Sequence, residues 1–242
     1  MVAAVTPWNY PISMVTRKVA PALAAGCTIV LKPAEATPLC AIAVFDILHE
    51  AGLPAGVANL VTTLDQAPVG KEFCTNPKVK KLTFTGSTAV GKKLSQDAAP
   101  QLKRVALELG GHAPFIVFDD ADPIHAAKGA SLVKFLNTGQ ACISPNRIFV
   151  QRGILDSFIQ TFTERVAKMK AGNGLESEVS IGPLVNHAAV EKVSRQVEDA
   201  LKKGAILHSG GKPLSGGQYS SGHFYAPTVL SNVSEDMVIY RE

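Results

Sequence analysis

The segment that decides the fold occupies residues 81–91 and reads KLTFTGSTAVG. Its first half is rich in apolar and branched residues, which predicts a buried strand, and a helical pattern begins after Gly86. Backbone N–H groups left unpaired at the start of such a helix point toward an incoming anion, a geometry that binds phosphate. The segment lacks the second glycine of a GxGxxG motif because Thr88 stands there, so an ordinary capped helix start explains it equally well.

The same alternation of strand and helix extends along the chain on both sides of this segment. Short branched runs predict further strands over Val2–Thr6, Thr28–Leu31, Asn59–Thr62 and Arg104–Leu109. Helical spacing of Ala, Leu and Lys predicts helices over Ile12–Ala25, Pro38–Ala51, Gln66–Thr75 and Thr88–Ala99. The pattern predicts an α/β fold with a parallel, Rossmann-like sheet that is covered on both faces and gathers ligands at the carboxyl ends of its strands.

A second α/β region follows the glycine pair Gly110-Gly111, which predicts a hinge. The boundary gives a partial dinucleotide-binding domain over residues 1–109 and a partial catalytic domain over residues 110–242. Within the second domain the pattern predicts strands over Pro114–Phe118, Arg147–Gln151 and Phe224–Leu230, helices over 122–137, 154–170 and 188–203, and an exposed hairpin or loop over Gly210–Gly222.

Composition limits the class of protein and its partners. The chain has 242 residues, 46% of them apolar and 18% charged, which excludes a disordered tail and leaves room for a large core. The net charge of +4 arises before residue 109, which suits a small phosphate-bearing ligand and is too sparse for a nucleic-acid binder. The start of the chain, Met1–Trp8, has neither a basic segment nor a long apolar run, so we expect no signal peptide, no membrane span and no membrane partner.

The cysteines indicate a reducing compartment. Cys27, Cys40, Cys74 and Cys142 stand far apart without CxxC spacing, and the six histidines form no close pair. This usage favours a cytoplasmic protein without disulfides and without a metal site.

Two residues at the end of the predicted second strand are candidates for cofactor binding. Lys32 and Glu35, in the motif Lys-Pro-Ala-Glu, would hold the ribose hydroxyls of an adenine dinucleotide. A surface ion pair is the competing interpretation, because exposed Lys and Glu are common.

Three further side chains are candidates for chemistry. Glu108 stands among apolar residues at a strand end, where burial would raise its pKa and make it a general base. Cys142 lies in a polar loop after Gly139-Gln140, which favours a nucleophile over the small buried hydrophobe that a lone cysteine usually is. Asn9 would donate its amide to an oxyanion, although an Asn beside Pro and Trp is more often a turn residue.

Taken together, these motifs resemble the aldehyde dehydrogenases. Five of them occur in that family's order and spacing: Thr6-Pro7-Trp8-Asn9, Lys32-Pro33-Ala34-Glu35, Phe84-Thr85-Gly86-Ser87, Leu107-Glu108-Leu109-Gly110-Gly111 and Gly139-Gln140-Ala141-Cys142. The chain is most similar to the succinate-semialdehyde dehydrogenase branch, through Met14-Val15-Thr16-Arg17-Lys18, residues 22–27 and residues 113–119. It resembles only the central part of these longer proteins.

The resemblance implies a division of roles. Cys142 is the nucleophile, Asn9 holds the oxyanion, Glu108 activates water, and Lys18 belongs to the same catalytic group. The cofactor would be bound by Thr6, Pro7, Trp8, Lys32, Glu35, Thr85, Gly86, Ser87, Leu109 and Gly110. Arg17 would grip a carboxylate of the substrate.

The carboxylate of Glu35 accepts ribose hydroxyls and would repel a phosphate ester at the same place, so we expect NAD rather than NADP. The resemblance implies a small aldehyde as substrate, with succinate semialdehyde the leading candidate, and homo-oligomers among full-length relatives.

Two departures from the branch pattern affect this expectation. Relatives carry an arginine six residues before the nucleophile, whereas this chain has Leu136. A less polar aldehyde therefore becomes a stronger candidate for the substrate. Ser144 stands where some relatives have a second cysteine, which rules out a disulfide with Cys142 at this position. Two alternatives stay open: a truncated, non-catalytic fragment of such an enzyme, and a thiol hydrolase that pairs Cys142 with His112 or His125.

Overall fold

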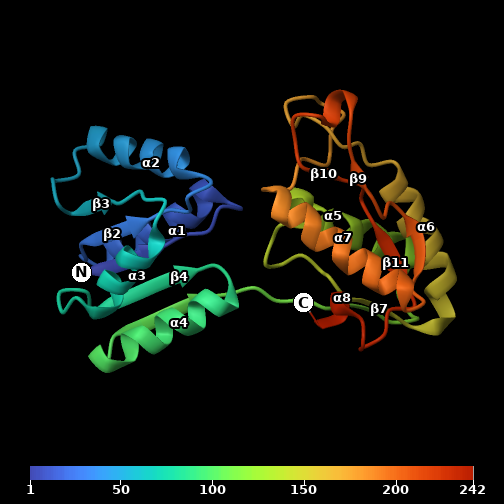
Figure 1. Cartoon of the computed structure of the whole chain (residues 1–242), viewed down its shortest axis with the longest axis horizontal. Helices are drawn as coiled ribbons and strands as arrows, with labels where there is room; N and C mark the ends of the chain where they lie inside the picture. The colour runs from blue at the N-terminus through green and yellow to red at the C-terminus, as the bar shows by residue number, and fades with distance from the viewer. Residues whose placement is uncertain (242) are drawn as a thin grey trace. The chain divides into compact units, whose positions relative to one another are not determined.

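A computed structural model describes residues 1–241 and divides the chain into two compact units. The first unit comprises Met1–Gly110, and the second begins at Gly111 (Figure 1). The division falls between Gly110 and Gly111, the glycine pair predicted to be a hinge.

The first unit contains a five-stranded parallel sheet, as predicted. Its strands lie in the order β3-β2-β1-β4-β5, with bounds Val2–Val5 (β1), Ile29–Lys32 (β2), Ala58–Leu60 (β3), Lys81–Thr85 (β4) and Arg104–Glu108 (β5). The order reverses at β1, which pairs with β2 on one side and β4 on the other. In open α/β sheets ligands bind beyond the carboxyl ends of the strands at such a reversal.

Four helices cover the two faces of this sheet. They span Pro11–Ala24 (α1), Pro38–Glu50 (α2), Gln66–Thr75 (α3) and Thr88–Ala98 (α4). One face carries α1 and α2, whose side chains pack against Val2, Ala4, Ile29 and Leu31. The opposite face carries α3 and α4, which pack against Ala3, Leu82 and Phe84. Because alternate residues of a strand point to opposite faces, the apolar runs of β1 and β2 contribute to both cores.

The second unit is built around a pair of parallel strands and two long helices. The strands are Phe115–Val117 (β6) and Ile148–Val150 (β7), paired in parallel. The helices are Pro123–Lys134 (α5) and Leu155–Ala167 (α6), and their buried side chains form one core with Val117. The remaining elements are α7 (His187–Lys202), β8 (Ile206–Ser209), β9 (Pro213–Leu214), β10 (Phe224–Tyr225), β11 (Val229–Ser231) and α8 (Val238–Arg241).

Several predicted boundaries in the second unit are wrong. The helix expected over 122–137 ends at Lys134, because Asn137 and Thr138 adopt left-handed backbone angles. The helix expected over 154–170 likewise ends early, at Ala167. The strand expected over Phe224–Leu230 divides into β10 and β11, which pair with β9 and β8 respectively. Pro227 lies at the division, and proline cannot donate a ladder hydrogen bond.

No helix within residues 1–241 combines the length and the apolar character needed to cross a bilayer.

Candidate active site

The predicted cofactor-binding residues of the first unit lie at or just beyond the carboxyl ends of its strands. Thr6 directly follows β1, and its N–H donates to the carbonyl of Lys32 at the end of β2, at 3.2 Å. Gly86 follows β4, and its N–H donates to the carbonyl of Glu108 at the end of β5, at 3.1 Å. These main-chain bonds continue the pairing of β1 with β2 and of β4 with β5 beyond the ends of the strands. Pro7, Trp8 and Asn9 continue the chain from Thr6 and are half-buried.

Lys32 and Glu35 form an ion pair at the end of β2. The lysine side chain is only 5% exposed and that of Glu35 is 29% exposed. The predicted ion pair therefore forms, with its lysine buried and its carboxylate partly exposed, and the role of the pair in cofactor binding stays a prediction. A buried cation held by one half-buried carboxylate leaves that carboxylate able to accept further hydrogen bonds from hydroxyl groups.

The turn between β4 and α4 has the features of an anion-binding helix start. The Oγ of Ser87 accepts from the N–H of Val90 at 3.4 Å and caps α4. The hydroxyl of Thr85 is buried, and within residues 1–241 it has no hydrogen-bond partner. Buried hydroxyls are nearly always paired, so an unpaired one at a strand end fits a ligand that completes it. The residues of this turn fit a dinucleotide at the strand ends.

Lys18 lies on the buried side of α1 and is 6% exposed. Its Nζ donates to the hydroxyl of Thr83 on β4 at 3.0 Å. Burial lowers the pKa of Lys18 to about 8; Glu108 opposes this shift, and Arg17 and Lys81 add to it. The charge interaction links Lys18 to Glu108, so two of the predicted catalytic residues belong to one neighbourhood.

Glu108 itself is exposed, so the predicted burial of this carboxylate is wrong. The reason is its position: β5 is the last strand of the sheet, and alternate residues along it, including Arg104 and Ala106, are exposed on the same side. Burial within the first unit therefore supplies no reason for Glu108 to act as a base. Arg17 is exposed on α1.

Cys142 lies in the second unit, on the loop that follows α5. Of the four free thiols, that of Cys142 is exposed, that of Cys74 is buried, and those of Cys27 and Cys40 are half-buried. The loop begins with three consecutive left-handed residues, Asn137, Thr138 and Gly139 (φ 51°, 60° and 77°). A side chain in this conformation costs about 1–2 kcal/mol, and for a β-branched residue such as threonine it is rare. Strain of this kind persists only where surrounding contacts enforce it.

Contacts with residues 182–185 enforce this conformation. The hydroxyl of Thr138 accepts from the N–H of Gly182 at 3.0 Å, and Oε1 of Gln140 accepts from the N–H of Val185 at 2.9 Å. The amide of Gln140 also donates to the carbonyl of Pro183 at 3.3 Å. Gly139 is required at its position, because a Cβ there would lie 3.2 Å from the carbonyl oxygen of Lys134 in addition to the left-handed strain.

Lys134 contacts this loop and is not among the site residues predicted from the sequence. Its Nζ donates to the Oγ of Ser144 at 3.1 Å and to Oδ1 of Asn146 at 2.7 Å, and burial lowers its pKa to about 8. The available signal was a single cation in the apolar run from Leu132 to Leu136.

Two histidines, His112 and His125, are the candidate bases of the thiol-hydrolase alternative. His125 is exposed, and its Nδ1 lies 2.7 Å from Oδ2 of Asp122 at the start of α5. Burial lowers the pKa of His112, with Arg147 as the next contribution. Neither observation supports a base directed at Cys142.

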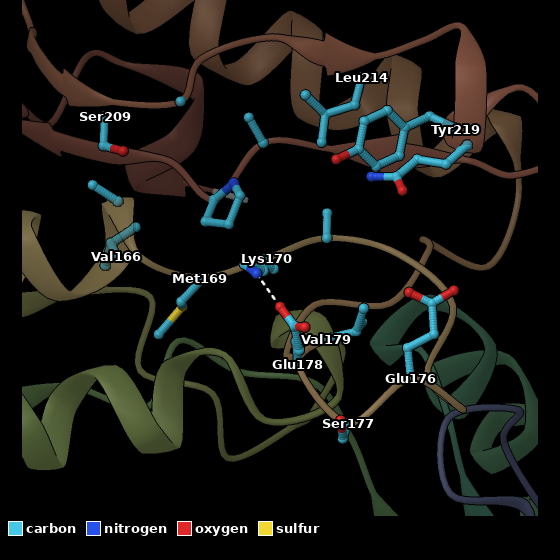
Figure 2. Close-up of a pocket in the computed structure, with 16 residues that line it drawn as sticks. Val166, Met169, Lys170, Glu176, Ser177, Glu178, Val179, Ser209, Leu214 and Tyr219 are labelled. Atoms are coloured by element: carbon cyan, nitrogen blue, oxygen red, sulfur yellow. Dashed lines mark hydrogen bonds and ion pairs between the residues drawn. The ribbon is translucent and has the colours of Figure 1, made fainter.

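A cavity of about 860 Å³ lies in the second unit, and Cys142 is not among the residues that line it (Figure 2). Its lining includes the ion pair of Lys170 and Glu178 together with Leu214 and Tyr219 (Figure 2). Of the residues predicted to act in catalysis or binding, none lines this cavity. Among residues 1–241 no group of three or more His, Cys, Asp or Glu side chains is arranged to hold a metal ion.

Comparison with known proteins assigns the family. The model of the aldehyde dehydrogenase family matches residues 1–242. The chain belongs to the aldehyde dehydrogenase family.

The individual relatives point to one branch of this family. The chain is 52% identical over its whole length to a probable succinate-semialdehyde dehydrogenase [NADP(+)] of Sinorhizobium fredii and covers 48% of that protein. It is 53% identical to a mitochondrial succinate-semialdehyde dehydrogenase of Oryza sativa, of which it covers 45%. The crystal structure of succinate-semialdehyde dehydrogenase from Burkholderia pseudomallei matches 98% of this chain with a TM-score of 0.94 and 50% identity, and 48% of that protein's chain is covered. The chain spans about half the length of the curated relatives it matches.

Proposed function

We propose that this chain carries the nucleophile, the water-activating base and the dinucleotide-binding edge of an enzyme that oxidises a small aldehyde to a carboxylic acid. The observation that carries the proposal is the exposed thiol of Cys142 on a strained loop that distant contacts hold in place. A rigid exposed thiol suits nucleophilic attack, whereas a structural cysteine is usually buried.

The chemistry follows from the residue types. The sulfur of Cys142 adds to the aldehyde carbon, a C–S bond forms, and the carbonyl oxygen becomes an oxyanion that the Asn9 amide and the Cys142 N–H stabilise. NAD, when bound by residues such as Lys32, Glu35 and Thr85, would supply the two-electron oxidant that takes hydride from that carbon, so that the adduct on Cys142 becomes a thioester. Glu108 then takes a proton from water, which attacks the thioester, and the C–S bond breaks to release the acid and the thiolate. Lys18 contributes a buried ammonium close to Glu108.

We propose NAD as the preferred cofactor, although the Sinorhizobium fredii relative is named for NADP(+). The half-buried carboxylate of Glu35, paired with Lys32, supports this choice. A carboxylate and a phosphate about 4 Å apart repel each other by about 4 kcal/mol at the effective dielectric of a protein surface. The test is the ratio of kcat/KM for NAD to kcat/KM for NADP. Glu35→Gln should lower this ratio at least tenfold. An NADP preference in the unaltered chain would refute this role for Glu35.

The substrate that best fits the chain is a semialdehyde or a less polar relative. Arg17 is available to bind a carboxylate, whereas Leu136, 45% exposed, replaces the arginine expected before the nucleophile. We expect succinate semialdehyde to be oxidised with a higher KM than an uncharged aldehyde of equal length. Leu136→Arg should reverse that order, and an unchanged order would contradict the assignment.

The direct test is formation of NADH from a panel of aldehydes. Turnover should disappear in Cys142→Ala and persist in Cys27→Ala, which removes a half-buried thiol as a matched control. Binding of NAD without turnover would favour the alternative of a non-catalytic fragment. Aldehyde turnover that survives Cys142→Ala would overturn the cysteine mechanism.

A further inference from the structure

A main-chain hydrogen bond from the fourth residue to the first closes the turn that carries Cys142. The N–H of Ser144 donates to the carbonyl of Ala141 at 3.1 Å, so residues 141–144 form a turn with Cys142 at its second position. Both central side chains, Cys142 and Ile143, are exposed, while Ser144 is only 1% exposed. The turn therefore presents the thiol outward and anchors itself through Ser144.

The anchor of Ser144 is Lys134, at the last position of α5. The Oγ of Ser144 donates to the main-chain carbonyl of Lys134 and accepts from its Nζ, each at 3.1 Å. The same Nζ donates to Oδ1 of Asn146 at 2.7 Å. One lysine thus binds the turn from two directions and also binds the residue that follows Pro145.

We propose that Lys134 is a positioning residue for the nucleophile: its ammonium, bound to Ser144 and Asn146, holds the 141–144 turn in the conformation that presents the Cys142 thiol. The inference rests on the proposed role of Cys142. A charged donor shared by two acceptors gives stronger and more directional bonds than a neutral one.

Charge and burial support this role over a surface function. Lys134 is half-buried at the end of an otherwise apolar run, and its pKa is lowered to about 8 by that burial alone. No carboxylate bonded to its Nζ appears among the ion pairs of residues 1–241. An ammonium kept in such surroundings needs oxygen acceptors, and Ser144 and Asn146 supply them.

The loop is attached at two separate places, which makes the proposal testable at one of them. The first is the contact of Lys134 with Ser144, and the second is the set of contacts with residues 182–185, among them the bond between Thr138 and the N–H of Gly182. Loss of the first should loosen the 141–144 turn while the second stays closed. General unfolding of the unit would open both together.

The experiment is amide hydrogen exchange of the whole chain, resolved to single residues, in wild type and in Lys134→Met. We expect the Ser144 amide to exchange at least tenfold faster in the variant, with the Gly182 amide changed less than twofold. Lys134→Arg, which keeps a cation and several donors, should restore most of the protection. Lys128→Met serves as the control, because Lys128 is an exposed lysine of the same helix.

Ser144→Ala provides a second route, since it removes the hydroxyl without removing the lysine. It should accelerate exchange of the Ser144-position amide similarly, and combining it with Lys134→Met should add less than threefold, because both changes break the same bond. Unchanged exchange in both single variants, or equal acceleration at Gly182, would overturn the proposal. These results do not depend on turnover, so an inactive chain would refute the proposed function without contradicting the role of Lys134 in holding the 141–144 turn.

Discussion

Lys18 provides a sharp test of how burial shapes the first unit. It is 6% exposed, and its Nζ has one neutral partner, the hydroxyl of Thr83, at 3.0 Å. Replacing it with methionine keeps an apolar side chain of similar length and removes the titrating group. The difference between the two proteins then reports on the ammonium alone.

The magnitude follows from the pKa, which burial lowers from 10.5 to about 8. Each tenfold change in an ionisation constant corresponds to about 1.4 kcal/mol, so protonated Lys18 lowers the free energy of unfolding by about 3 kcal/mol. Below pH 8 the lysine is protonated in both the folded and the unfolded chain, and the full penalty is present. Between pH 8 and 10.5 the unfolded chain binds more protons than the folded one, so stability rises with pH.

The assay is urea unfolding at intervals from pH 7 to 10.5, followed by the fluorescence of Trp8. Trp8 is the only tryptophan of the chain and lies in the first unit with Lys18. Subtracting the Lys18→Met values removes contributions from other groups that titrate in this range. The free energy of unfolding of the wild type should rise by about 3 kcal/mol relative to the variant across this interval.

Lys92→Met is the matched control, because Lys92 is an exposed lysine of α4 in the same unit. Its difference curve should be flat. If the Lys18→Met and wild-type curves run parallel, or if the wild type loses stability relative to the variant as pH rises, the argument from burial is refuted.

Three further substitutions test packing and capping. Gly91→Val should lower the free energy of unfolding by about 1–3 kcal/mol, because a Cβ at Gly91 would lie 2.6 Å from Cδ2 of Leu109; an unchanged urea midpoint would contradict this. Asn186→Ala should cost about 1 kcal/mol, since its Oδ1 caps α7 by accepting an N–H at 2.9 Å, and Asn186→Asp should retain most of that stability. Phe158→Ala should cost about 3–5 kcal/mol in thermal or urea unfolding, because the ring is buried and stacks on Phe162 with centroids 5.6 Å apart; a loss below about 1 kcal/mol would show that the site collapses around the deletion.

Much of the first unit could be predicted from local pattern. The runs at Lys81–Thr85 and Gln66–Thr75 form a strand and a helix with the predicted bounds, and the remaining elements differ by one or two residues. Strands buried on both faces have a continuous apolar signature, and Ser87 marks the start of α4 as a cap. These signals depend only on neighbouring residues, so they can be recognised in the sequence without the tertiary structure.

The second unit was less predictable, for a physical reason. The end of α5 at Lys134 depends on the left-handed conformation of Thr138, which its contact with Gly182 stabilises. Those two residues are 44 positions apart. A contact of that separation leaves no local pattern, and nothing in the run around Lys134 distinguishes a helix that continues from one that stops.

The sequence alone determined the order of the elements, the α/β class and the identity of the reactive residue types, because periodicity, caps and motifs are properties of neighbouring residues. Only the tertiary structure decided which charges are buried. Lys18 of α1 is buried and donates a hydrogen bond to Thr83 of β4, 65 positions away, whereas Glu108 is exposed because its strand is the last of the sheet. Burial is set by what packs against a residue, and that partner lies elsewhere in the chain.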